Sequence, residues 1–385
     1  MKAIRSFFQN ALDRPRSLRL RKLVFDVHLY AGLLVGVFVL VVGVSGSAIV
    51  FEPEMTRALN SDITLVERTP GRASLQSIID TLKKKQPGIR LFRIYLPNLA
   101  NLAASANSTD EAYEILSIAE TNGTEANGTQ ANAEKRFTNT YADPYTGRIL
   151  GSRARGSGLL GWLVDLHENL LTGTKGRVVN GGVAILLLIL SISGLVIWWP
   201  GRRLWVKRIV ITKKHGWKRF IWYLHNAVGF WVSLVLAIIS FSGIYFAFPQ
   251  ATRYVVKVLT FSADQSRPPT TVSAPDIAQA NTNSVTANSV TPNSVTLDQL
   301  VNSAQEAIPG GQVTTIRFPN STEDPMRLDV NLPYDLSERG NSSVFLDQTD
   351  GKVLRVDRFD QMSLGTKIIT SSVWIHFGRF TDDKW

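Results

Sequence analysis

The chain of 385 residues contains no cysteine at all. Without thiols it can form no disulfide, iron–sulfur cluster, thiolate-bound metal site or covalently attached c-type haem. Any redox cofactor must therefore be held by other side chains. Histidine is also scarce, with five residues in the chain, so the position of each one can be weighed individually.

Charged residues are missing from three long apolar stretches, which cover Val27–Phe51, Val178–Trp199 and Phe220–Phe248. Each exceeds the roughly 20 residues that cross a bilayer as a helix. We therefore expect an integral membrane protein with an α-helical bundle of three spans, at residues 27–52, 177–200 and 220–249. The absence of charge inside the spans disfavours a transporter with a charged pathway.

Basic residues exceed acidic ones by 42 to 31 and gather beside the apolar stretches. This distribution favours membrane topology over nucleic-acid binding. The positive-inside rule assigns the N-terminal arm, residues 1–26, and the short loop, residues 201–219, to the cytoplasm. A second interpretation of the loop is a docking surface for an acidic electron donor. The first stretch is longer than the apolar part of a signal peptide, so we expect a retained anchor.

The two polar regions, residues 53–176 and 250–385, are expected outside the cytoplasm. Each holds a predicted α+β module, at about residues 74–151 and 296–357. A helix, a turn and a strand are predicted for 74–97 and again for 296–319, and a hairpin follows each at 141–151 and 345–355. The Asn/Ser/Thr-rich inserts 106–135 and 281–295 are expected to be loops or linkers.

The repetition extends into the membrane and indicates an internal duplication. Aligning His28 with His225 places Gly32 on Gly229 and Ser45-Gly46 on Ser242-Gly243. Positions four and eighteen residues after a histidine return to its face of a helix. Glycine in a helix marks close approach, either of another helix or of a flat cofactor.

The histidines form two predicted pairs at two depths. His28 and His225 lie at the cytoplasmic ends of their spans, whereas His167 and His376 lie near the outer face. A porphyrin ligated on both sides needs two imidazoles that face each other at one depth. The competing interpretation is that each histidine lies at the membrane surface with one side of its ring exposed to water. His215, in the cytoplasmic loop, fits neither pair and is interpreted as a surface residue.

Several stretches together resemble the PepSY-associated transmembrane proteins: VHLYAGLLVGVFVLVVGVSGSAIVF, DLHENLLTG with GLVIWWPGRR, LHNAVGFWVSLVLAIISFSGIYFAFP and IHFGR. The segments PGIRLFRIYLP with ADPYTGRILG, and PGGQVTTIRFP with LDQTDGKVL, resemble their PepSY modules. That family includes iron-regulated ferric-siderophore reductases of the bacterial inner membrane with four helices and b-type haems. The resemblance implies haem b between His28 and His225, and a second, periplasmic haem between His167 and His376.

The chain departs from this family pattern because no fourth apolar span follows His376. Two interpretations stay open, a truncated gene product or a homodimer that completes the bundle. The predicted function is one-electron transfer from membrane quinol or a cytoplasmic reductase to a ferric siderophore, since the cytoplasmic segments are too short for a nucleotide-binding fold. No catalytic residue is assigned. The alternative is a non-enzymatic membrane anchor whose PepSY modules bind or regulate a periplasmic partner such as a protease.

Overall fold

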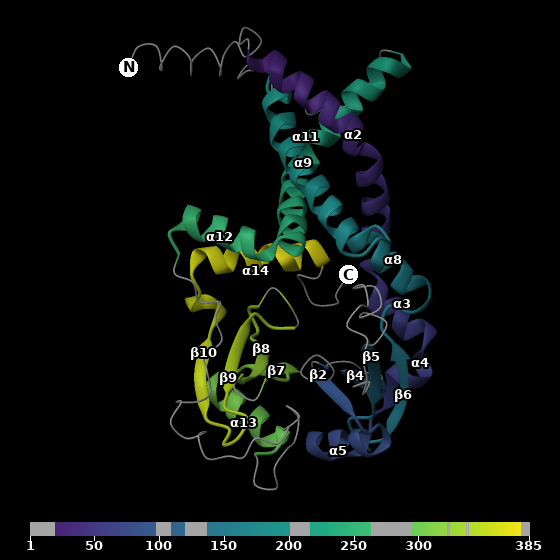
Figure 1. Ribbon diagram of the computed structural model, residues 1–385, viewed down its shortest axis with the longest axis vertical. Coiled ribbons are helices and arrows are strands. Elements are labelled where there is room, and N and C mark those ends of the chain that lie inside the picture. Colours follow the sequence, from purple (N-terminus) through teal and green to yellow (C-terminus); the bar gives the residue numbers. More distant parts are fainter. Residues whose placement is uncertain are drawn as a thin grey trace. The chain divides into compact units, whose positions relative to one another are not determined.

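The computed structural model describes residues 20–97, 109–119, 137–200, 216–262, 295–321, 324–335, 337 and 339–378. The chain divides into two compact units. The helical unit comprises Met1–Ser47 and Leu166–Val256, and the sheet unit comprises Ala48–Asp165 and Lys257–Trp385. Figure 1 shows the elements of both units, and each unit is described by itself below.

The helical unit contains three long apolar helices: α2 (Leu20–Ile49), α9 (Thr174–Trp198) and α11 (Trp217–Ala247). Within the described part of the chain, these three are long and apolar enough to cross a membrane. The three predicted spans are therefore present, although each helix begins earlier than its apolar stretch. Basic residues in these first turns, such as Lys22 and Lys218, can extend their charged ends to the membrane surface.

Small residues let α9 and α11 pack closely. A Cβ atom on Gly181 would lie 2.5 Å from the Cβ of Ala247, and one on Gly243 would lie 3.4 Å from the Cβ of Ala184. Buried serines on the helices satisfy their hydroxyl groups locally; Ser191, for example, donates to the carbonyl of Leu187. Such small residues are typical of helix contacts in membranes.

The amino-terminal end of α2 lies beside the carboxyl-terminal end of α9. The Arg21 guanidinium donates to the carbonyl oxygens of Ile197 and Trp199. These carbonyls lack helical partners, so the cation satisfies them and complements the helix dipole. Other faces of α2 stay exposed and apolar, as lipid contact requires, with Leu33, Leu34 and Val37 each about two-thirds exposed or more.

Prolines after two spans begin new helices. Pro53 lies in the first turn of α3 (Glu52–Leu59), and Pro249 is the first residue of α12 (Pro249–Thr260). Proline suits this position because its missing N–H would be unpaired in a first turn in any case. Further helices among the described residues are α4 (Ser61–Thr64), α8 (Gly158–Asn169), the short 3₁₀ helix η3 (Phe359–Gln361) and α14 (Leu364–Phe377).

The sheet unit is built on one antiparallel sheet of eight strands in the order β10-β9-β8-β7-β2-β4-β5-β6. Its first half contains β2 (Ile89–Tyr95), β4 (Tyr113–Ala119), β5 (Phe137–Ala142) and β6 (Ile149–Ala154). Its second half contains β7 (Gln312–Arg317), β8 (Met326–Asn331), β9 (Ser342–Leu346) and β10 (Val353–Asp357). The halves join where β2 pairs with β7. A separate pair, β1 (Leu65–Glu67) with β3 (Thr109–Glu111), completes the strands of the described residues.

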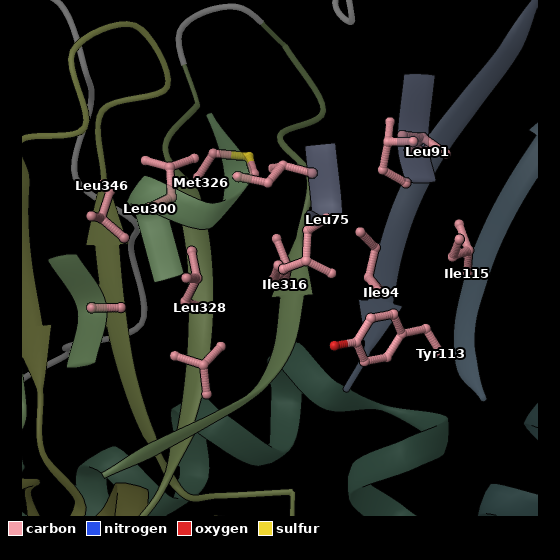
Figure 2. Close-up of a cluster of buried hydrophobic side chains, with 14 of the residues drawn as sticks. Leu75, Leu91, Ile94, Tyr113, Ile115, Leu300, Ile316, Met326, Leu328 and Leu346 are labelled. Carbon is pink, nitrogen blue, oxygen red and sulfur yellow. The ribbon is translucent and has the colours of Figure 1, made fainter. Parts of the chain in front are cut away.

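Two helices, α5 (Leu75–Lys85) and α13 (Leu297–Ala307), contribute to the core on one face of the large sheet. Figure 2 shows part of this core, in which Leu75 and Leu300 pack with Ile94, Ile316 and other strand residues. Ile94, Ile316 and Leu328 are 0 or 1 % exposed. One continuous core therefore underlies both halves of the sheet.

The two helices also cap one another. The Asp298 carboxylate on α13 accepts hydrogen bonds from the backbone N–H groups of Leu75 and Gln76 at the start of α5. The Gln76 side chain in turn accepts a bond from the N–H of Leu297 at the start of α13. Unpaired donors at both helix ends are thus satisfied across the join between the halves.

The predicted helix–turn–strand and hairpin segments are confirmed as α5-β2, α13-β7, β5-β6 and β9-β10. Gly88, Gly147, Gly310 and Gly351 have positive φ values at the turns. The prediction of a loop for residues 106–135 is wrong at β3 and β4, where Tyr113 and Ile115 lie in the core. The rest of that insert, and nearly all of 281–295, lies outside the described residues. The two expected modules share one sheet, and an internal duplication stays a prediction.

Candidate functional site

Two of the predicted ligands, His28 and His225, come together in the helical unit. Each is the ninth residue of its helix, His28 on α2 and His225 on α11. Their ring centroids lie 6.4 Å apart, with the ring planes at 70°. Residues almost 200 positions apart in sequence therefore present their imidazoles to one another at one level.

A hydrogen bond from α9 fixes the orientation of the His28 ring. The Nδ1 atom of His28 lies 3.0 Å from the Oγ of Ser193. The Ser193 Oγ also lies 3.3 Å from the carbonyl oxygen of Leu190, and a hydroxyl that donates to this carbonyl accepts from the Nδ1–H tautomer of His28. This assignment leaves the Nε2 lone pair of His28 for another partner, the arrangement typical of a metal-binding histidine with an outer hydrogen bond.

A glycine gives the His28 ring its space on α9. A Cβ atom on Gly194 would lie 3.2 Å from the Cε1 of His28, tighter than an ordinary van der Waals contact. Ser193 therefore contributes a hydrogen-bond partner for the His28 ring, and Gly194 contributes space, because it has no side chain.

His167, on α8, is held in a similar way at a different level. Its Nδ1 lies 2.9 Å from the carbonyl oxygen of Val42 and must donate to it. A Cβ atom on Gly46 would lie 2.6 Å from the Cε1 of His167. Val42 follows His28 by fourteen residues of α2, about 21 Å along the helix axis. The helical unit thus holds histidines at two levels along α2.

The four glycines that align between the first and third spans have different neighbours in the structure. Gly46 lies under the His167 ring, and Gly243 faces Ala184 of α9. Gly32 is in ordinary contact with Leu190, while no atom of the described residues approaches the Cβ position of Gly229 within 4 Å. Close approach by a ring or a helix therefore explains Gly46 and Gly243 but not Gly229.

The spacing of the His28 and His225 rings is compatible with two imidazole ligands on one metal ion. Metal–imidazole nitrogen bonds are about 2 Å long, and a ring centroid lies about 1 Å behind its nitrogen, so two imidazoles in line on one metal have centroids about 6 Å apart. The observed 6.4 Å meets this distance. Histidine is also a normal axial ligand of haem iron, and the cysteine-free chain offers no thiolate.

The other predicted residues are placed as follows. His376 lies near the end of α14 in the sheet unit, next to Phe377, and its pairing with His167 stays a prediction. His215, most of the basic arm and residues 201–215 lie outside the described residues. Within the described part of the chain, no cluster of three or more His, Asp or Glu side chains could hold a metal ion without a porphyrin.

Sequence reasoning missed Ser193 and Gly194. The signal was present, because the second span contains Ser191-Ile-Ser193-Gly194 and the third contains Ser240-Phe-Ser242-Gly243. Only the Ser-Gly dipeptides of the first and third spans entered the alignment. A search for the dipeptide in every apolar stretch would have found the partner of His28.

A glycine-rich loop between β6 and α8 has the spacing of a dinucleotide-binding motif. Residues 156–161 read G-S-G-L-L-G. Dinucleotide binding requires a parallel β–α–β unit, whereas β6 pairs antiparallel with β5 at the edge of an antiparallel sheet. A Cβ atom on Gly161 would lie 2.0 Å from the backbone of Gly156, so this glycine is explained by the tight turn into α8.

Comparison with protein families gives a match to the family model described as the PepSY-associated TM region. The match covers residues 25–383 and therefore includes nearly the whole chain. A search of the curated proteins finds no match.

Proposed function

Because the chain belongs to the family of the PepSY-associated TM region and is a membrane protein, we propose that it carries haem b and transfers electrons across the bacterial inner membrane. Its N-terminus lies in the cytoplasm in this proposal. The observation that supports the haem most directly is the facing pair His28 and His225, with ring centroids 6.4 Å apart.

Each residue of the site has a defined task in this proposal. His28 and His225 would hold the haem iron, and Ser193 would orient the His28 ring through its hydrogen bond to Nδ1. Gly194 leaves room for the ring. A haem held by these two histidines would supply one-electron transfer. His167 and His376 are the residues that would hold a second haem.

The substrate that we propose is a ferric siderophore on the periplasmic side. Membrane quinol or a cytoplasmic reductase gives one electron per iron, and Fe(III) becomes Fe(II). Hard oxygen chelators hold ferric iron more tightly than ferrous iron, so the reduction releases the metal. The three apolar helices support this direction because they separate a donor on one side from an acceptor on the other.

The first experiment is an absorption spectrum of the full-length protein, expressed with ample haem and purified in detergent, before and after dithionite. A pyridine haemochrome assay gives the haem content. We expect a sharp reduced α band that is lost in His28→Ala and His225→Ala. The matched control is Asn226→Ala, which changes the neighbour of His225 on α11 and should keep the band.

A second step tests the substrate. The dithionite-reduced protein, freed of excess reductant, is mixed with a ferric siderophore, and the α band is followed in time. Loss of the reduced band, with Fe(II) captured by a ferrous chelator, is the expected result. A colourless protein would overturn the haem proposal, and a stable reduced band would overturn the reductase proposal alone.

A further inference from the structure

Arginines of three adjacent strands lie directly opposite one another on the face of the sheet that points away from α5 and α13. Arg93 of β2 pairs with Arg317 of β7, and Arg317 pairs with Arg327 of β8. Residues that face each other across antiparallel strands project on the same side. Like charges in this arrangement repel each other, so a row of three guanidinium groups requires compensation.

One buried carboxylate compensates part of this charge. Asp329, which is 4 % exposed, accepts hydrogen bonds from the Nε atoms of Arg317 at 2.7 Å and Arg327 at 2.8 Å. Ser343 donates to the same carboxylate. Two cations thus share a single anion, and the row keeps an excess of positive charge.

A fourth guanidinium group, that of Arg339, joins Arg93 on one aromatic ring. The Cζ of Arg93 lies 4.7 Å from the ring centroid of Tyr95, and the Cζ of Arg339 lies 4.4 Å from the same centroid. The two guanidinium carbons are therefore no more than about 9 Å apart, close enough for one anion with two charged groups to contact both. Tyr95 holds these cations through its ring face, which contributes no formal negative charge.

A further carboxylate that interacts with these cations is Glu114. It lies opposite Tyr95 on β4 and accepts a hydrogen bond from the Asn139 side chain at 2.6 Å. Burial raises the pKa of Glu114 and disfavours its charged form, whereas the nearby Arg339, Arg93 and Arg155 act in the opposite direction. Burial and the nearby Arg155, Arg317 and Arg339 lower the pKa of Arg93.

Arg93 also has an unused donor. Its Nε is buried and makes no hydrogen bond to any residue that the structure describes. A buried donor without a partner is rare in native proteins and costs free energy when it is left empty. An acceptor that arrives from outside the chain would satisfy it.

We propose that Arg93, Arg317 and Arg339, grouped around Tyr95, form a binding site for a small polyvalent anion with carboxylate or phosphate groups. The planar guanidinium group donates two parallel hydrogen bonds to such groups. Several guanidinium groups close together favour an anion that carries more than one of these groups. The site lies entirely within the sheet unit. It uses none of the proposed haem ligands, and its occupancy does not depend on haem.

Isothermal titration of the full-length protein in detergent at low salt tests the proposal, with citrate and inorganic pyrophosphate as probes and acetate as the monovalent reference. We expect saturable binding of at least one polyvalent probe, with affinity that falls steeply as salt rises. Arg339→Gln, on an exposed loop, should weaken binding about tenfold or more. Arg93→Gln should do the same, with its folding checked by thermal unfolding.

The matched control is Arg358→Gln, which removes one positive charge from the same unit at a site paired with Asp360. Binding should be unchanged in this variant. If neither polyvalent probe binds saturably, or if Arg358→Gln weakens binding as much as Arg339→Gln, the proposal is wrong. Because the readout is anion binding to protein with or without haem, this result is independent of the spectrum.

Discussion

Replacement of Gly46 by alanine should destabilise the protein through the ring of His167. The new Cβ would lie 2.6 Å from the Cε1 and 2.9 Å from the Nδ1 of that ring. Ordinary contacts between such atoms begin near 3.5 Å, so the ring must move by about 1 Å. Its hydrogen bond to the carbonyl of Val42, now 2.9 Å long, would then be lost.

The expected cost combines two terms. Loss of the hydrogen bond contributes about 1 kcal/mol, and forcing an extra carbon into a packed site contributes about 1–3 kcal/mol. The free energy of unfolding should therefore fall by about 2–4 kcal/mol. Thermal unfolding of the purified protein in detergent, followed by intrinsic tryptophan fluorescence, measures this change.

The same helix offers a matched control in Gly43, whose Cβ position has no atom within 4 Å. Gly43→Ala should leave stability unchanged or raise it by up to about 1 kcal/mol, because alanine favours helix more than glycine does. Removing the ring in Gly46→Ala/His167→Ala should cancel most of the additional loss in a double-mutant cycle. Equal unfolding temperatures for Gly46→Ala and Gly43→Ala would refute the packing of the His167 ring against α2.

Three further predictions follow from the sheet and from the ring of His28. Burial raises the pKa of Glu114 above its ordinary value near 4.5. The contribution of this side chain to the free energy of unfolding is therefore most favourable below pH 4.5, where the carboxyl group is neutral in both states. It is lost as the pH rises through the pKa of Glu114 in the folded protein. Glu114→Gln should therefore gain in thermal stability over the wild-type protein between pH 4.5 and pH 8, and a constant difference would contradict this. Asp329→Asn should lower the free energy of unfolding by about 2–3 kcal/mol. This value is smaller than that for a fully buried ion pair, because the side chains of both arginine partners are over a third exposed. A urea titration that shows no change in the free energy of unfolding would contradict this prediction. Ser193→Ala should lower haem content after purification about tenfold or more at equal haem supply, and the haemochrome assay would refute this by finding full occupancy.

The three membrane helices and most strands of the sheet could be predicted because their signals are local. A run of more than twenty uncharged apolar residues allows few structures besides a membrane helix. A helical pattern of apolar residues that is followed by a turn at Gly88 or Gly310 and then by alternating polar and apolar residues also allows few structures besides helix, turn and strand. These patterns need no knowledge of the rest of the chain.

β4 was missed because its composition was averaged with that of its surroundings. Residues 106–135 are rich in Asn, Ser and Thr, but the seven residues of β4, YEILSIA, alternate between the two faces of the sheet. Tyr113, Ile115 and Ser117 are buried on alternate positions. Composition and alternation measured over about seven residues, the length of a strand, would have distinguished this segment from the rest of the insert.

The pairing of β2 with β7 could not be predicted from local patterns. The two strands are more than 200 residues apart, and each could equally have formed an edge of its own module. Burial on one face decides the outcome, because the single core needs residues from both α5 and α13. The same pairing brings Arg93 beside Arg317, so the arginine row exists only once the halves have joined.

The surroundings of His28 argue against the interpretation of this residue as an ordinary interfacial histidine. An interfacial side chain gains most when its polar atoms reach water. The Nδ1 of His28 is instead directed to a serine on a neighbouring helix, its carbon edge lies against a glycine, and its ring faces a second histidine. Helix packing alone would be served as well by leucine at this position, without the need for a serine hydroxyl or for the glycine space. The three contacts together fix the direction of one ring nitrogen, which is what a metal ligand requires and what an interfacial residue does not.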